Sequence, residues 1–250
     1  MEITSPPQNV ASRMLSGLSG VWSSYVALVD LKEDNRELKG ENRLLTGEAL
    51  RAKELGLENQ RLRKLLEFKR ERKDLKTVAA HVIGKDVSPY ARVVRVAVDV
   101  GDADGIAEGM PVVANEGLVG RVGQVSGQYA EVMLTVDPRS SVNVKVAGKG
   151  VTGTLQGSQA SSLYSARLLY LHKAEAVAIQ DTLVTSGHDR IFPPGIEVGY
   201  IRSVEERQRG VYYEMQVTPA VNFSILEEVL IVVSVTVGSE STAGDGEGAP

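Results

Sequence analysis

The spacing of hydrophobic residues divides the chain into a helical first part and a strand-rich second part. Near the start they recur at intervals of three and four, at Met14, Leu18, Val21, Tyr25 and Leu28. That period predicts an amphipathic helix, and Trp22 beside Tyr25 also fits a helix lying at a membrane surface. Beyond residue 76 the period becomes two, most clearly in residues 94–100, 142–146 and 213–217, which predicts half-buried strands. The fold is therefore expected to be mostly β with an N-terminal α-helix.

Residues 30–72 carry a repeat typical of a two-stranded coiled coil. The pattern Asn-x-x-Leu occurs three times, and its first two copies, at Asn35 and Asn42, are seven residues apart. Asn at position a of a heptad, with Leu at d, favours parallel, in-register pairing, because a buried Asn needs its own copy as a partner. The predicted seam of the homodimer consists of Asn35, Leu38, Asn42, Leu45, Asn59, Leu62 and Leu66.

The middle of this seam is expected to be weak. Asn42 and Asn59 are seventeen residues apart, two heptads plus three, and such an insertion overwinds a coiled coil locally. Gly40, Gly47 and Gly56 each cost about 1 kcal/mol relative to Ala in a helix. We therefore expect a coil of modest stability that pairs mainly when something else brings two copies together. The alternative is a single long helix packed on its own domain.

The second part is predicted to form two small β-barrels. Turn residues separate roughly a dozen short strands, a spacing typical of barrels or sandwiches. A faint internal repeat relates residues 109–122 to residues 180–201, each being a strand, a turn and a strand that opens with Gly. The expected domains are a flexible start (1–9), a helix and parallel coiled coil (10–76), a first barrel (77–160), a second barrel (161–237) that can share strands with the first, and a disordered tail (238–250).

Charge is distributed unevenly along the chain. Residues 30–76 contain 14 basic and 11 acidic residues, whereas residues 77–250 contain 13 basic and 20 acidic ones. Residues 61–76 alone hold eight basic and three acidic residues, but Phe68 is their only aromatic, so no platform for stacking bases is present. We interpret this run as a solvated helix end whose cations complement the helix dipole, and no nucleic acid is expected.

Cysteine usage and hydropathy bear on the compartment. The chain has no Cys, which excludes disulfides, thiolate metal sites and Cys nucleophiles. No run of about 18 apolar residues is present, so no transmembrane helix is predicted. Residues 1–9 lack the basic and apolar regions of a signal peptide. If the protein works outside the cytoplasm, its export signal or membrane anchor is expected to lie outside this sequence.

No catalytic, cofactor or metal site is predicted. His81, His172 and His188 fall in no metal-binding pattern. Residues 185–189 (TSGHD) place a hydroxyl, an imidazole and a carboxylate close together, but a catalytic triad needs groups that converge from separate segments. A polar loop in which Ser and Asp cap backbone amides is the better interpretation. Residues 101–105 (GDADG) lack the third acid and the final Glu of a calcium loop, so a tight acidic turn is expected.

Several short motifs, taken in their order and spacing, resemble the MreC family of bacterial rod shape-determining proteins. They are ENQRLRKLL (58–66), VIGKD (82–86), GIAEGMPVV (105–113), GLVGRV (117–122), VTSG (184–187) and FPPGIEVG (192–199). The likeness covers residues 25–237, and it departs from the family at Gln180, where Gly is expected, and at Asn222, where an acid is common.

The resemblance implies two β-barrels behind a dimerising helix and a non-catalytic role as a scaffold of the cell-elongation complex. It implies binding to a class B penicillin-binding protein (the elongation-specific transpeptidase), cooperation with MreD and MreB, and self-association beyond the dimer. It also implies a periplasmic location at the inner membrane. Two other interpretations remain open: a periplasmic adaptor of an efflux or secretion system, and a barrel-type serine protease. For partner binding, we expect short strands to leave partly open barrel edges.

Overall fold

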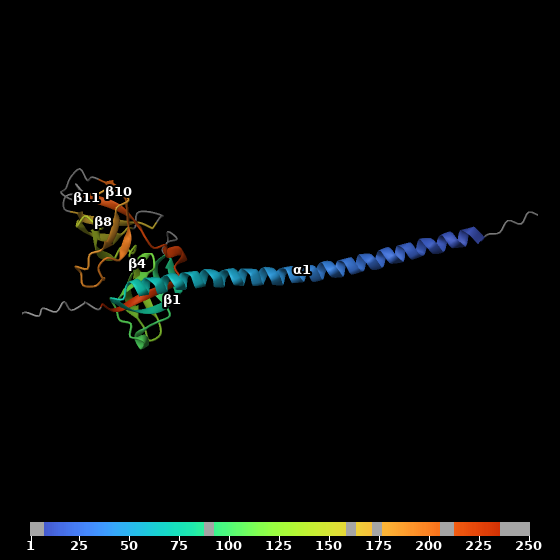
Figure 1. The fold of residues 1–250 in the computed structure, drawn as a ribbon, viewed down its shortest axis with the longest axis horizontal. Helices are drawn as coiled ribbons and strands as arrows, with labels where there is room; N and C mark the ends of the chain where they lie inside the picture. The colour runs from blue at the N-terminus through green and yellow to red at the C-terminus, as the bar shows by residue number, and fades with distance from the viewer. Residues whose placement is uncertain (1–7, 88–92, 159–163, 172–176, 206–212, 236–250) are drawn as a thin grey trace, which may run out of the picture. The chain divides into compact units, whose positions relative to one another are not determined.

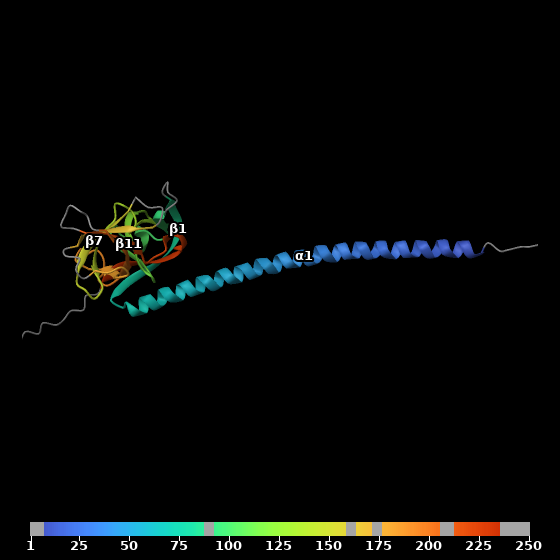
Figure 2. The ribbon, with the colours of Figure 1, turned by 90° about the horizontal axis from the view of Figure 1, so that it is seen from above.

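The computed structural model describes residues 8–87, 93–158, 164–171, 177–205 and 213–235. The chain divides into two compact units, residues 1–60 and 61–250. Helix α1 (Gln8–Glu71) is uninterrupted, and its turns after residue 60 belong to the second unit (Figures 1 and 2). It begins inside the segment expected to be flexible and ends five residues before the expected boundary at 76. The rest of the expected flexible start and the expected disordered tail lie outside the described residues.

The remainder of the described chain is built from strands and two short 3-10 helices. The strands are β1 (Leu75–Val87), β2 (Val93–Val98), β3 (Pro111–Ala114), β4 (Gly117–Val125), β5 (Ala130–Leu134), β6 (Ser141–Val146), β7 (Thr152–Gly157), β8 (Ala166–Leu171), β9 (Thr182–Thr185), β10 (Glu197–Glu205), β11 (Tyr213–Pro219) and β12 (Glu228–Val235). The 3-10 helices are η1 (Asp102–Asp104) and η3 (Phe223–Ile225). The predicted fold class, a long helix followed by mostly β structure, is confirmed.

The strands form two closed antiparallel barrels. The first has the order β1-β12-β3-β4-β5-β2 and the second the order β10-β11-β8-β7-β6-β9. The expected boundary at residue 160 therefore differs from the structure, since it separates β7 from its barrel neighbour β8. The chain's last described strand, β12, belongs to the first barrel and pairs with β1. This closure joins strands distant in sequence, which local periodicity does not reveal.

Strand β1 closes the first barrel because it is long enough to serve two neighbours. Its first part, from Leu75 to His81, pairs with β12, and its second part, from Val82 to Val87, pairs with β2. Closure gives each described strand a neighbour on both sides. The sequence predicted partly open barrel edges, and this prediction is wrong, because both barrels are closed. A partner must therefore be recognised by side chains and not by an open strand edge.

The internal repeat corresponds to equivalent strand pairs, β3–β4 and β9–β10. A Cβ at Gly120 in β4 would lie 2.0 Å from the carbonyl oxygen of Met133, and one at Gly199 in β10 would lie 2.2 Å from that of Thr218. Glycine is thus required at both close approaches of neighbouring strands.

The repeat also explains the departure at Gln180. Two residues before β3, Gly109 has φ 87° and its N–H donates to Val122. Two residues before β9, Gln180 has φ 74° and donates to Ile201 in the same way. Gln180 is therefore a non-glycine residue in the left-handed region, which disfavours a side chain.

Two hydrophobic clusters form the core of the second unit. One fills the first barrel around Val98, Val132 and Ile231. The other fills the second barrel and continues onto outward-facing residues of the first, namely Leu75, Val113, Leu118, Leu230 and Val232. Leu65 belongs to this second cluster and Phe68 packs against it. The two barrels and the end of α1 are consequently held together by one continuous hydrophobic cluster.

Asp137 stabilises the segment that leads from β5 of the first barrel to β6 of the second. Its carboxylate is 3% exposed and lies 2.7 Å from Nη2 of Arg139 and 3.8 Å from Nε of Arg95 in β2. Burial raises the pKa of Asp137, but hydrogen bonds from Arg139 and the charges of Arg139 and Arg95 outweigh it and hold the pKa below its usual value. Gly157 of β7 packs against this segment, where a Cβ would lie 2.3 Å from the carbonyl oxygen of Val136.

Candidate interaction sites

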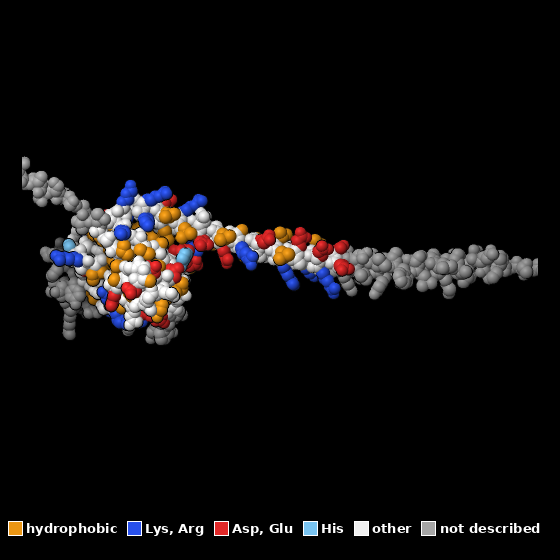
Figure 3. Space-filling model, turned by 90° about the horizontal axis from the view of Figure 1, so that it is seen from below, with side chains coloured by type: hydrophobic (Ala, Val, Ile, Leu, Met, Phe, Trp, Pro, Cys, Tyr) orange, Lys and Arg blue, Asp and Glu red, His pale blue; other side chains and the backbone are white. Residues whose placement is uncertain are grey.

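Helix α1 presents many leucines to solvent. Figure 3 shows hydrophobic, acidic and basic side chains interspersed along its described stretch. All seven predicted seam residues are exposed, and the leucines among them are between 38% and 63% exposed. Further exposed leucines are Leu44, Leu50, Leu55 and Leu57. The dimer itself stays a prediction, but the side chains that it requires are accessible.

The continuous helix puts the two halves of the predicted seam on different faces. At about 100° per residue, Asn42 and Asn59 lie about 100° apart around the axis. Leu44, Leu55 and Leu66, in contrast, recur every 11 residues, and each step turns only about 20°. These three leucines, called here the leucine stripe, form a straighter apolar line than the predicted heptads do.

The last turns of α1 pack against the barrels through a different face. Leu65 is 6% exposed, whereas Leu66 is 55% exposed. Leu66 lies about 100° around the axis from Leu65 and about 160° from Phe68, which also packs on the core. The end of the helix can therefore contact the barrels and a second helix at the same time.

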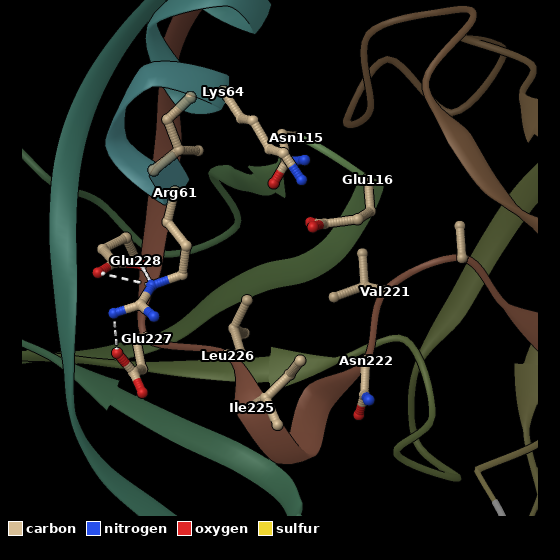
Figure 4. A pocket seen from close by; sticks show the side chains of 12 residues that line it. Arg61, Lys64, Asn115, Glu116, Val221, Asn222, Ile225, Leu226, Glu227 and Glu228 are labelled. Atoms are coloured by element: carbon tan, nitrogen blue, oxygen red, sulfur yellow. Dashed lines mark hydrogen bonds and ion pairs between the residues drawn. The ribbon is translucent and has the colours of Figure 1, made fainter. Parts of the chain in front are cut away.

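Arg61 joins the helix end to β12. Its Nε donates to Oε2 of Glu228 at 2.8 Å and to Oε1 at 3.2 Å, and its Nη2 pairs with Glu227 (Figure 4). The Glu228 side chain is 6% exposed, so this is a largely buried carboxylate. Sequence reasoning treated Arg61 as part of a solvated run and missed this pair. The available signal was the acidic pair Glu227–Glu228 directly before an apolar strand.

A pocket lies beside this ion pair, where the end of α1 meets the β3–β4 turn and the segment that leads into β12 (Figure 4). Its volume is about 140 Å³. Its buried lining comes from Leu65, Val221 and Leu226, with Ala220 half-buried. The rest of its lining consists of the exposed Ile225 and of polar side chains, namely Arg61, Lys64, Asn115, Glu116, Asn222, Glu227 and the buried Glu228. We call this site the Arg61 pocket.

The turn that carries Ile225 is held on several sides. Asn222 caps η3, its Oδ1 accepting from the N–H of Ser224 at 3.2 Å. Lys85 Nζ donates to the carbonyl of Ser224 at 2.8 Å. Phe223 is fully buried, and its ring centroid lies 5.6 Å from that of Tyr164. Ile225, in contrast, is 68% exposed, so an apolar side chain is presented at the rim of the pocket on an anchored turn.

The loop with Ser186, His188 and Asp189 has a capping role. Asp189 Oδ1 accepts from the N–H groups of Ile191 and Phe192, both at 3.1 Å, and its Oδ2 accepts from Asn143 at 3.4 Å. Ser186 Oγ accepts from the N–H of His188 at 3.3 Å. The predicted polar loop that caps backbone amides is confirmed. Phe192 joins the core of the second barrel, and Arg72 donates to the Pro194 carbonyl at 3.2 Å, so this loop also fastens the end of α1.

The acidic turn at residues 101–105 is likewise structural. Asp104 Oδ2 accepts from the N–H of Gly101 at 3.0 Å, as expected for a capped turn. Among the described residues, no group of three or more His, Cys, Asp or Glu side chains is arranged to hold a metal ion. His172 lies outside the described residues. No described helix is long and apolar enough to cross a membrane.

Comparison with known proteins places these barrels in a family. Residues 82–233, which cover most of both barrels, match the family described as rod shape-determining protein MreC, barrel core. The cell shape-determining protein MreC of Escherichia coli is 30% identical over 224 residues, which are 86% of this chain and 57% of that protein. The chain thus spans little more than half the length of this relative.

Solved structures agree with this match. A structure described as MreC has a TM-score of 0.65 and 28% identity, over 71% of this chain and 98% of that one. A chain in the complex between Penicillin-Binding Protein (PBP2) and MreC from Helicobacter pylori shares the fold, with a TM-score of 0.50 and 18% identity over 63% of this chain and 99% of that one. The match to the barrel core and the agreement in fold show that this chain belongs to the MreC family.

Proposed function

We propose that this chain is a non-catalytic scaffold of the bacterial cell-elongation complex, which organises peptidoglycan synthesis and rod shape. The observation that carries the proposal is the match of both barrels to the MreC barrel core. The Helicobacter pylori complex pairs a protein of this fold with a penicillin-binding protein. We extend that partner class to this chain, with MreD and MreB as further members of the assembly and the periplasmic side of the inner membrane as its location.

Self-association along α1 is the second part of the proposal. The exposed leucines provide an apolar face, and burial of such a face between two helices is what stabilises a coiled coil. Two or more copies held together bind a clustered partner with higher avidity than one copy does. The capping roles of Ser186 and Asp189 favour the scaffold over the serine protease.

Binding of the full chain to an immobilised ectodomain of the class B penicillin-binding protein from the same bacterium tests the proposal. We expect a dissociation constant on the order of micromolar per site, because only 5% of the residues are aromatic and hot spots of protein interfaces are enriched in Trp and Tyr. Raising the surface density of the ectodomain should slow dissociation of the dimer. Absence of binding, together with peptidase activity that Ser186→Ala abolishes, would restore the protease interpretation.

A further inference from the structure

We infer that the Arg61 pocket receives one large hydrophobic side chain of the penicillin-binding protein, presented beside a basic residue of that partner. This inference rests on the proposed function and adds the place and the chemistry of recognition. Closed barrels leave recognition to side chains, and the Arg61 pocket combines a buried apolar lining with a polar rim. That combination is the anatomy of an energetic hot spot in protein interfaces.

The size of the pocket sets the size of the anchor. An apolar cavity of about 150 Å³ accepts a benzene molecule. At about 140 Å³, the Arg61 pocket has room for one aromatic ring or one branched aliphatic side chain. Leu65, Val221 and Leu226 supply its buried apolar contacts, and each is at most 6% exposed. Ile225, at the rim, extends this apolar surface toward the partner.

The site is largely formed before a partner arrives. The turn with Ile225 is held by the Asn222 cap and by Lys85, and the helix side is held by Arg61 against Glu228. Binding therefore orders few additional groups. Because ordering side chains and loops costs free energy, a preorganised site binds more tightly than a mobile one with the same contacts.

The charges around the pocket favour a cationic neighbour for the anchor. One guanidinium, that of Arg61, serves two carboxylates, Glu227 and Glu228, which leaves this corner with a net charge of 1 − 2 = −1. Glu116 adds a further negative charge and Lys64 a positive one, so the five charged side chains that line the pocket sum to 2 − 3 = −1; Lys85, which donates to the Ser224 carbonyl, is not among them. A basic residue on the partner is attracted by this net negative charge, whereas an acidic one is repelled. A second copy of the chain is expected to pack on the leucine stripe, which lies on another face of α1, and so the Arg61 pocket is left for a different partner.

Two substitutions test the pocket without altering its charge. Ala220→Leu fills the pocket, and Ile225→Ser removes the apolar rim. Each should weaken binding of the full chain to the penicillin-binding protein ectodomain by about tenfold or more. Ile179→Ser is the matched control, because Ile179 is an isoleucine of similar exposure (60% against 68% for Ile225) outside the pocket, and the affinity of this variant for the ectodomain should stay unchanged. Thermal melting of each variant verifies that the fold is intact.

Two further substitutions test the sign of the charge. Glu116→Lys should weaken binding, Lys64→Glu should strengthen it, and added salt should reduce the difference between them. If the unaltered chain binds and the four pocket variants bind equally well, the proposed function stands and this inference is wrong. The inference is also wrong if Glu116→Lys binds the ectodomain more tightly than Lys64→Glu does. It is equally wrong if Ile225→Ser loses self-association but keeps its affinity for the ectodomain. If the unaltered chain does not bind, both proposals fall.

Discussion

Arg61 and Glu228, 167 residues apart in the sequence, meet at 2.8 Å and join the end of α1 to the first residue of β12. Glu228 is buried beneath this contact, whereas Arg61 remains partly in solvent, with 36% of its side chain exposed. The pair also forms one wall of the Arg61 pocket. The stability of the barrel unit and the shape of the candidate binding site therefore depend on the same contact.

Removal of Arg61 should destabilise the barrel unit more than removal of both partners does. Arg61→Ala leaves the buried carboxylate of Glu228 without its main partner, and we expect a loss of about 2 kcal/mol in the free energy of unfolding, less than a fully buried pair shows. Adding Glu228→Gln should recover part of that loss. Denaturant unfolding of the two single variants and the double variant measures the coupling, and strictly additive losses would mean that the pair is not coupled.

Gln180→Gly should stabilise the protein. A side chain at φ 74° is disfavoured, whereas glycine adopts this conformation freely and loses only some backbone entropy, so we expect a gain of about 0.5–1 kcal/mol. Gly109→Gln, at the equivalent position of the first barrel, is the reciprocal variant and should be destabilising. The melting temperatures of both variants test this, and a lower one for Gln180→Gly would contradict it.

The Asp137 carboxylate should make stability depend on acidic pH. Because its pKa is lowered in the folded state, its contribution is fully present above the unfolded pKa of about 3.9 and is lost as the pH falls through the folded value. Asp137→Asn should be less stable at pH 6 and should lose less stability between pH 5 and pH 3 than the unaltered chain. Parallel curves of unfolding free energy against pH would show that this carboxylate makes no such contribution.

Self-association should depend on one face of α1. Leu55→Asp with Leu66→Asp would place carboxylates in the leucine stripe, and light scattering should then report a monomer. Leu57→Asp is the control, because Leu57 is also exposed (47%) but lies about 180° around the helix from Leu66. Leu38→Asp with Leu45→Asp tests the heptads predicted from the sequence. An unchanged mass for both double variants would argue against the coil.

Local patterns in the sequence determined the kind of each element. The change from a period near 3.6 to a period of two separates the helix from the strands, because a side chain's direction repeats with the local backbone geometry. The repeat of residues 109–122 in residues 180–201 marked the equivalent strand pairs. The resemblance to the MreC family, rather than a local pattern, implied that Gly is expected at the position of Gln180. Ser186 and Asp189 were correctly interpreted as capping residues, since such bonds form between near neighbours.

Tertiary structure alone decided which strands share a barrel and what meets at the pocket. β12 pairs with β1, although the two strands are far apart in the sequence. β6 and β7 belong to the second barrel, so the boundary expected at residue 160 differs from the structure. The Arg61 pocket combines a helix end, a turn between strands and a segment near the C-terminus, each unremarkable in sequence. Periodicity reports only the direction in which a residue faces. Which distant residue it meets depends on barrel closure and on the packing of one shared hydrophobic cluster, and both are properties of the whole fold.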